Sequence, residues 1–251
     1  MNTLLSRLLG LALAAFIGTV ASAADLTASA AASLTNAFQE LAQRFEAANP
    51  DTRVQFNFGA SGTLLQQIAK GAPADVFASA DQETMDQAQS RNLIRSEGRR
   101  NFALNALVVI VPAGSSRTPK ALGDLARPEY KRIAIALPAS VPVGRYTKAV
   151  LEQAGLWSTI EPRMIGAQNV RQALDYTARG EVDAGFVYAT DAALMPDRVK
   201  VALTVPTPTP VLYPIAPVAG STQLDGARKF IAFVQSAPAQ AILIKYGFGK
   251  P

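Results

Sequence analysis

The 251-residue sequence contains no histidine and no cysteine. These are the commonest ligands of protein zinc sites, and histidine is the base of a Ser-His-Asp triad, so most zinc enzymes and such triad hydrolases are excluded. Without cysteine, the chain forms no disulfide and carries no lipid anchor on a thiol. We therefore expect a fold that depends on packing alone, with no cofactor and no direct metal ligand.

Charged residues are also scarce, at 17% of the chain, whereas hydrophobic residues make up 49%. That balance is typical of a globular protein and argues against intrinsic disorder. The 24 Lys and Arg residues outnumber the 19 Asp and Glu residues, which gives a formal net charge of +5. Because the basic residues are scattered along the chain instead of clustered, no nucleic-acid partner is expected.

Residues 1–24 have the parts of a secretory signal peptide: a polar start that carries Arg7, an apolar run, and the small-residue pattern ASA at 21–23. A permanent membrane helix, which needs about 20 unbroken apolar residues, is the less favoured alternative. We expect cleavage after Ala23 or Ala24. With no cysteine and no second apolar span, the mature protein is expected to be free in the periplasm.

From residue 25 onward, short β-like runs alternate with amphipathic helical segments, which predicts an α/β fold with mostly parallel strands. Apolar residues at helical spacing predict a helix over 34–48, and strict alternation predicts a strand over 54–58. The other expected strands are 26–30, 75–80, 106–112, 132–137 and 185–188, and the other expected helices are 62–70, 145–153, 170–179, 223–236 and 238–246.

The chain shows no repeat of fixed period and no flexible linker, and two lobes joined by short strand crossovers fit this pattern. We expect lobe 1 over 25–104, lobe 2 over 105–214, and a return to lobe 1 over 215–251. The Pro-rich stretch 205–220 cannot be a central helix, because proline lacks the N–H donor and clashes with the preceding turn. It is predicted to be an edge-like strand or connecting chain.

Four turns rich in hydroxyl or amide groups lie where an expected strand leads into a helix. Backbone N–H groups at a helix N-terminus are unpaired and carry partial positive charge, so such turns bind anions. One such turn alone indicates only a capped helix, because Ser and Asn are preferred N-caps. Four together favour an anion held by neutral donors. The turns are 31–35, 59–63, 141–144 and 168–170.

Tyr188 ends an expected strand, the place where open α/β sheets hold ligands, so its hydroxyl is a further candidate donor. The alternative is a tyrosine at a sheet edge with its hydroxyl in water. The segment GASGT around Ser61 partly matches a nucleophile elbow, but its glycines do not fit G-x-S-x-G. A Ser-Lys hydrolase with Lys70 or Lys148 as base stays open as an enzymatic alternative.

Six motifs occur in a characteristic order and spacing: AAASLTNAF, GAPADVFASADQ, VPVGRYTKAVL, NVRQAL, GFVYATDA and KYGF. Together they closely resemble the periplasmic molybdate-binding proteins of molybdate ABC transporters, over nearly the whole mature chain. The resemblance implies a two-lobed type II periplasmic binding protein with a mixed, mostly parallel sheet in each lobe and a ligand cleft between the lobes. It also implies a non-enzymatic monomer that captures molybdate or tungstate and delivers it to a membrane permease.

In that family, serine hydroxyls, backbone amides and one tyrosine hydroxyl bind the oxygens of the anion, and no charged side chain touches it. Carried over motif by motif, the resemblance implies these ligand-binding residues: Ser33, Ser61, Val143, Val170 and Tyr188. The family commonly has alanine where this chain has Val143. That position contributes its amide N–H, so valine is expected to keep the hydrogen bond and narrow the pocket.

Arg145 and Arg171 follow two of these amide donors. They are expected to be solvated and to add only long-range attraction. Two alternatives to a molybdate receptor remain besides the hydrolase: a receptor for sulfate or thiosulfate, and a structural or adhesive envelope protein.

Overall fold

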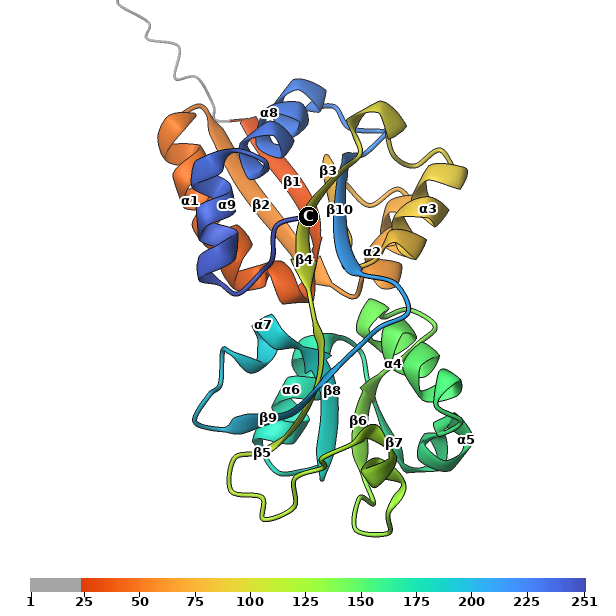
Figure 1. The fold of residues 1–251 in the computed structure, drawn as a ribbon. Coiled ribbons are helices and arrows are strands. Elements are labelled where there is room, and N and C mark those ends of the chain that lie inside the picture. Colours follow the sequence, from red (N-terminus) through yellow and green to blue (C-terminus); the bar gives the residue numbers. More distant parts are fainter. Residues whose placement is uncertain (1–23) are drawn as a thin grey trace, which may run out of the picture.

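The computed structural model describes residues 24–251, so the expected signal peptide lies outside the described residues except for Ala24. The chain forms two halves, one above the other in Figure 1, and each is a five-stranded sheet flanked by helices. We call the half that contains the N-terminal strand lobe 1 and the other half lobe 2. No helix within residues 24–251 is long and apolar enough to cross a membrane.

Lobe 1 is built from the N-terminal and C-terminal parts of the chain. Its strands are β1 (Ala24–Ala31), β2 (Thr52–Gly59), β3 (Val76–Ala78), β4 (Arg100–Asn105) and β10 (Val211–Pro217). Its helices are η1 (Ala32–Leu34), α1 (Thr35–Ala48), α2 (Ser61–Ala69), α3 (Gln82–Ser90), η2 (Ser96–Gly98), α8 (Leu224–Val234) and α9 (Ala237–Lys245). The strand order is β2-β1-β3-β10-β4.

Lobe 2 is built from the middle of the chain. Its strands are β5 (Leu107–Pro112), β6 (Ile133–Ala136), β7 (Met164–Ala167), β8 (Ala184–Tyr188) and β9 (Val199–Val205). Its helices are η3 (Leu122–Ala126), α4 (Pro142–Gln153), α5 (Trp157–Ile160), η4 (Glu161–Arg163), α6 (Val170–Ala178) and α7 (Ala189–Ala192). The strand order is β7-β6-β8-β5-β9.

Both sheets are mixed, and the α/β fold predicted from the alternating pattern is confirmed. β1 runs parallel to β2 and β3, and β6 runs parallel to β7 and β8. The remaining pairings, made by β10 with β3 and β4 and by β5 with β8 and β9, are antiparallel. Parallel pairs therefore make up half of the described pairings and not most of them. The reason is that β5 and β10, the first strand after each crossover between the lobes, run opposite to their neighbours in the sheet.

The chain crosses between the lobes twice, from β4 to β5 through Ala106 and from β9 to β10 through residues 206–210. The return to lobe 1 was expected at residue 215, but the strand that returns begins at Val211. The reason is that the Pro-rich stretch is not all connecting chain. Its second half forms β10, which pairs with lobe 1 on both sides.

The stretch is extended and connecting chain as predicted, but its strand is not at an edge, because β10 lies between β3 and β4. Proline is normally confined to sheet edges, since it cannot donate to the ladder. Pro214 is accommodated inside the sheet because the register with β4 shifts between Tyr213 and Pro214. The residue left out of the regular pairing is Phe102 of β4, and Pro214 pairs with Asn101. On its other side, Pro214 needs no N–H, because its carbonyl oxygen accepts the N–H of Ser79 at 2.9 Å.

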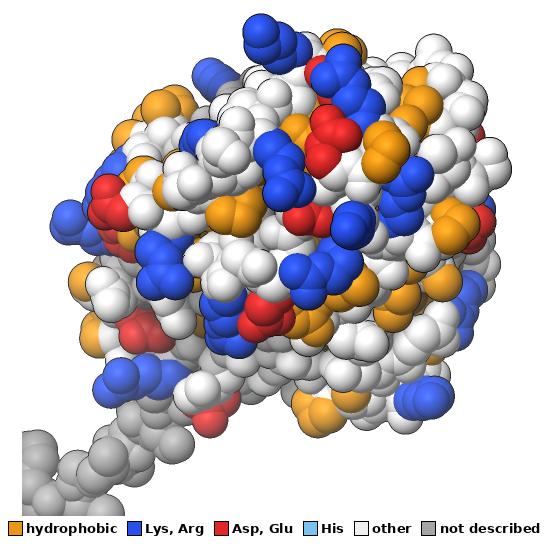
Figure 2. Space-filling view, turned by 90° about the horizontal axis from the view of Figure 1, so that it is seen from below, with side chains coloured by type: hydrophobic (Ala, Val, Ile, Leu, Met, Phe, Trp, Pro, Cys, Tyr) orange, Lys and Arg blue, Asp and Glu red, His pale blue; other side chains and the backbone are white. Residues whose placement is uncertain are grey.

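The outer end of lobe 2 has no block of like charge. Figure 2 views this end and shows Lys and Arg side chains spread over the face, with Asp and Glu between them. The scatter of basic residues along the sequence therefore persists on this surface. The lobe interface is the more informative part of the molecule, because β1, β2, β6 and β8 all end there (Figure 1).

Candidate functional site

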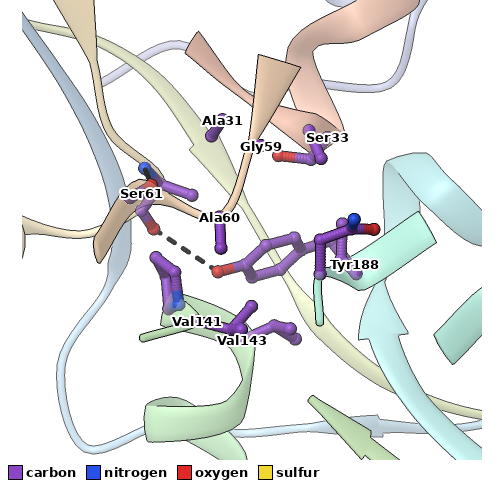
Figure 3. A pocket seen from close by; sticks show the side chains of 13 residues that line it. Ala31, Ser33, Gly59, Ala60, Ser61, Val141, Val143 and Tyr188 are labelled. Carbon is purple, nitrogen blue, oxygen red and sulfur yellow. Dashed lines mark hydrogen bonds between the residues drawn. The ribbon is translucent and has the colours of Figure 1, made fainter. Parts of the chain in front are cut away.

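All five residues predicted to bind ligand line one cavity between the lobes. Ser33 and Ser61 follow β1 and β2 of lobe 1, whereas Val143, Val170 and Tyr188 lie where β6, β7 and β8 of lobe 2 end. Figure 3 shows the two serines opposite Val143 and Tyr188. The carboxyl ends of parallel strands are the usual place for ligands in α/β folds, and here two such edges face each other.

The cavity is small and uncharged. Its volume is about 10 Å³, which is about the space that one water molecule needs, so the two lobes are drawn close together around it. Its lining carries no Lys, Arg, Asp or Glu side chain. The 13 lining residues are Ala31, Ala32, Ser33, Gly59, Ala60, Ser61, Ala80, Val141, Pro142, Val143, Asn169, Val170 and Tyr188.

The helices that begin at the cavity are mostly uncapped. The N-cap residues of η1, α2 and α4 are Ala31, Ala60 and Val141, and none of them makes a side-chain cap. The serines are therefore not caps, because each lies inside the first turn. First-turn N–H groups have no partner within their helix, so those that face the cavity can donate to a ligand, and the helix ends supply partial positive charge. The Gly62 N–H of α2 is an exception, because it donates to the Ser140 carbonyl. Only α6 is capped, by the Asn169 side chain on the N–H of Gln172.

Both serine hydroxyls are buried and held by protein groups. Ser61 is fully buried, and its Oγ accepts a hydrogen bond of 3.1 Å from the N–H of Ala80. The Ser33 Oγ lies 2.9 Å from the hydroxyl of Tyr213, which is also buried. These contacts fix the two oxygens at the cavity wall. Ser61 still has a proton to offer, because its contact with Ala80 uses only a lone pair. Ser33 has one to offer when the Tyr213 hydroxyl is the donor of their shared hydrogen bond.

Tyr188 reaches the cavity from the end of β8, and only 1% of its surface is exposed. Its hydroxyl donates a long hydrogen bond of 3.4 Å to the carbonyl oxygen of Ala80. Burial raises the pKa of Tyr188 well above its usual value, so the phenol keeps its proton and remains a donor. The alternative of a tyrosine with its hydroxyl in water is therefore wrong.

The amide groups of Val143 and Val170 are positioned by the first turns of α4 and α6. The start of α4 lies directly on the end of β6. A Cβ at Gly144 would stand 2.0 Å from the carbonyl oxygen of Ala136, so only glycine permits this approach. The close packing fixes the first turn of α4, and with it the Val143 amide, at the cavity.

Arg145 spans the lobe interface on one side of the cavity. Its guanidinium donates to Asp81 at 2.6 and 2.8 Å and to the hydroxyl of Thr84 at 2.6 Å, and both partners belong to lobe 1. Its side chain is only 17% exposed. The expectation that this arginine is solvated is therefore wrong.

Arg171 makes a matching contact from α6. Its Nε donates to Asp191 at 2.5 Å within lobe 2, and its terminal nitrogens donate to the Asn36 side chain at 2.8 Å and to the Ser33 carbonyl at 3.2 Å in lobe 1. Its side chain is 25% exposed, so it is not solvated as expected. Both arginines thus hold the lobes together from outside the cavity lining.

Asp191, the lobe 2 partner of Arg171, is fully buried, and its Oδ2 has no hydrogen-bond partner in the described structure. Burial raises its pKa from an ordinary value of 3.8 to about 6, and Arg171 opposes the rise. Between these pH values the folded state binds more protons than the unfolded state. The contribution of Asp191 to stability is therefore greatest below about pH 4 and is lost as the pH rises through 6.

We expect Asp191→Asn to remove this pH dependence. The wild type should lose about 3 kcal/mol of unfolding free energy relative to the variant as the pH rises from 4 to 6. This is the free energy that corresponds to a pKa raised from 3.8 to about 6. Urea unfolding of both proteins across this range, without ligand, measures the difference. A difference that is constant with pH would show that Asp191 does not titrate there.

The Ser-Lys hydrolase alternative has no geometric support. No lysine lines the cavity. Lys70 follows the far end of α2 from Ser61, about 13 Å along the helix. The Lys148 ammonium lies 5.5 Å from the centre of the Trp157 ring and 3.6 Å from Glu152. Neither amine is therefore placed to take a proton from Ser61.

Residues 26–249 match the sequence family described as bacterial extracellular solute-binding protein. The chain belongs to this family. This solute-binding protein is 34% identical over 236 residues to molybdate-binding protein ModA of Haemophilus influenzae, covering 91% of each chain. It is 36% identical over 229 residues to ModA of Escherichia coli, covering 89% of this chain and 88% of the relative.

Solved structures agree with this assignment. The periplasmic molybdate-binding protein of Azotobacter vinelandii superposes on this solute-binding protein with a TM-score of 0.77 at 25% identity, over 90% of this chain and 99% of that one. The sulfate-binding protein SubI of Mycobacterium tuberculosis gives 0.81 at 20% identity, over 90% and 87% of the chains, which shows the shared fold alone. The family confirms the prediction of a binding protein and not an enzyme.

Several residues at the site were not predicted from the sequence. Tyr213 and Ala80 contact the serine hydroxyls, and Asp81 and Asn36 receive the interlobe arginines. Tyr213 lies in the Pro-rich stretch, where no local pattern indicates that it reaches the cavity. Ala80 contributes only backbone groups, which leave no signal in the side-chain pattern.

Proposed function

We propose that this protein binds molybdate or tungstate in the cavity between its lobes and delivers the anion to the membrane permease of an ABC transporter. The observation that carries the proposal is the lining, in which hydroxyl groups and first-turn helix amides from both lobes face one small space without a charged side chain. The relatives named as molybdate-binding proteins, matched over about nine-tenths of the chain, support the same ligand.

Molybdate is a tetrahedral dianion whose oxygens only accept hydrogen bonds. A lining of hydroxyl and amide donors is complementary to it, and the uncapped helix N-termini stabilise its charge. Inside a closed cavity these hydrogen bonds are stronger than in water, because the local dielectric constant is low. No paired cation is therefore required for binding.

Selectivity over sulfate follows from size. Sulfate has the same charge and shape but shorter bonds to oxygen, so some donors of a shell fitted to molybdate would not reach it. Each buried donor left unpaired costs about 1–3 kcal/mol, so two such donors would lower the affinity by roughly 30-fold or more. Hydrogen phosphate is disfavoured further, because its O–H needs an acceptor.

Isothermal titration calorimetry with molybdate, tungstate, sulfate and hydrogen phosphate tests the proposal. We expect similar affinities for molybdate and tungstate, because the two ions have nearly the same size, and affinities for the other anions that are weaker by at least about 30-fold. Sulfate binding as tight as molybdate binding would make this a sulfate receptor. Absence of binding by every anion would favour a structural envelope protein.

The transport role places the protein outside the cytoplasmic membrane, as the extracellular solute-binding family indicates. We propose a periplasmic monomer, released by removal of the predicted signal peptide. Its lobes would separate and close about the two crossovers, at Ala106 and at residues 206–210. The closed form would present the surface that the permease recognises.

The interlobe contacts of Arg171 predict how molybdate affinity depends on salt. Because Arg171 donates to Asn36 and to the Ser33 carbonyl, Arg171→Ala should weaken the closed form and lower the affinity by about tenfold. Short hydrogen bonds in a partly buried contact are screened little, so the loss should be similar at low and high salt. A loss that disappears at high salt would mean that Arg171 acts only by long-range attraction. Titrations of both proteins at two salt concentrations measure this.

A further inference from the structure

Ser33 is connected to a chain of hydrogen bonds that runs away from the cavity. Its Oγ lies 2.9 Å from the Tyr213 hydroxyl on β10. That hydroxyl lies 3.2 Å from Nδ2 of Asn105, the last residue of β4. The Asn105 Oδ1 accepts the N–H of Ala106 at 2.9 Å, at the crossover between the lobes. None of these groups except Ser33 lines the cavity.

The direction of each hydrogen bond in this chain can be assigned. A backbone N–H only donates, so the atom of Asn105 that faces Ala106 is its oxygen, and Nδ2 faces Tyr213. The amide NH2 also only donates, so the Tyr213 oxygen accepts from it. The single proton of Tyr213 is then directed to its other partner, the Ser33 Oγ.

Ser33 is left with one defined role. Its Oγ accepts the proton of Tyr213, so its own proton is free to point into the cavity. Burial raises the pKa of Tyr213 well above its usual value, so the phenol does not ionise and the direction does not reverse. The Ser61 Oγ is also an acceptor for a protein group, because it accepts the N–H of Ala80. In both serines a fixed donor occupies the oxygen and the proton remains for the ligand.

We propose that Tyr213 and Asn105 are positioning residues that keep the Ser33 proton free, so that Ser33 donates it to an oxyanion bound in the cavity. This inference rests on the proposed function, since it concerns the ligand of the same cavity. An anion such as molybdate offers only acceptors and is bound. If the direction were reversed, Ser33 would donate to Tyr213 and would present only its lone pairs to the anion.

A double-mutant cycle with Asn105→Asp and Tyr213→Phe tests the chain directly. Asn105→Asp replaces the donating NH2 with an accepting oxygen of nearly the same size. Tyr213 would then donate to the new carboxylate and accept from Ser33, whose lone pairs would face the anion. The added negative charge of the aspartate also repels the anion. That repulsion is present with or without the Tyr213 hydroxyl, whereas the reversed hydrogen bond to Ser33 requires the hydroxyl, so the Tyr213→Phe background separates the two effects.

Molybdate titration of the four proteins gives the result. We expect Asn105→Asp to weaken binding at least about tenfold more in the presence of the Tyr213 hydroxyl than in the Tyr213→Phe background. Losses that multiply independently would overturn the inference and leave the proposed function intact. Absence of molybdate binding by the wild type would overturn both.

Tyr213→Phe alone gives a second measurement that does not depend on the folding of the aspartate variants. Without the phenol, Ser33 loses the partner that fixes the direction of its proton. The variant should therefore lose molybdate affinity by about three- to tenfold. Wild-type affinity in this variant would contradict the inference.

Tyr246→Phe is the matched control. It removes the hydroxyl of a tyrosine that donates to Glu40 on α1, outside the cavity lining. Molybdate affinity should stay at the wild-type value in this variant. A similar loss of molybdate affinity in both tyrosine variants would also overturn the inference.

Discussion

Replacing Ser33 and Ser61 together by alanine should lower molybdate affinity by a factor of about 10² to 10⁴. A hydrogen bond to a charged group contributes about 1.5–3 kcal/mol, and each substitution removes one hydroxyl donor from the cavity wall. Each also leaves a buried protein donor without its acceptor, the Tyr213 hydroxyl in one case and the Ala80 N–H in the other. The single variants should each show a smaller loss in the same direction.

Titration calorimetry of the two single variants and the double variant measures the effect. Ser90→Ala is the matched control, because Ser90 lies on the exposed end of α3 and bonds only to the Gln87 carbonyl. That variant should bind molybdate as the wild type does. If both cavity variants also retained wild-type affinity, the assignment of the site would be wrong.

Gly62→Ala should lower molybdate affinity by about 10² without destabilising lobe 1. Gly62 lies in the first turn of α2, and its N–H donates at 3.0 Å to the carbonyl oxygen of Ser140 in lobe 2. A Cβ at this position would stand 2.7 Å from that oxygen and 3.0 Å from the Ser140 Cα. Both atoms belong to the backbone of the opposite lobe, so the clash arises only when the lobes close.

Thermal unfolding without ligand separates closure from folding. Alanine is the better helix former by about 1 kcal/mol, so the ligand-free melting temperature of Gly62→Ala should not fall if the lobes are free to part. Gly226→Ala is the control, because the added Cβ in α8 meets only Leu26 at an ordinary 3.5 Å. Wild-type affinity in Gly62→Ala would show that the close contact with Ser140 is not needed for binding.

The sequence predicted the elements whose burial is regular. The expected helix at 34–48 and strand at 54–58 match α1 and β2 closely, because one face of each packs on the core and imposes its period. Strands β7 and β9 were not predicted. They are the two edges of the lobe 2 sheet, where partial exposure weakens both the apolar run and the alternation.

One local feature, a strand that leads into the first turn of a helix, indicated the four turns of the site, and the resemblance to molybdate-binding proteins implied the five candidate residues. What the sequence does not reveal is contact between segments far apart in the chain. Arg171 was expected to be solvated because nothing near it indicates Asn36, 135 residues away. Tyr213 was missed for the same reason, since it meets Ser33 across 180 residues.

A crystal structure of the protein with tungstate tests the central claim most directly, because the anomalous scattering of tungsten locates the anion. The account predicts one strong peak in the cavity, with the oxygens of the anion within hydrogen-bond distance of the Ser33, Ser61 and Tyr188 hydroxyls and the Val143 and Val170 amides. No Lys or Arg side chain should touch the anion. A peak elsewhere, or an anion held by a lysine or arginine, would contradict the account.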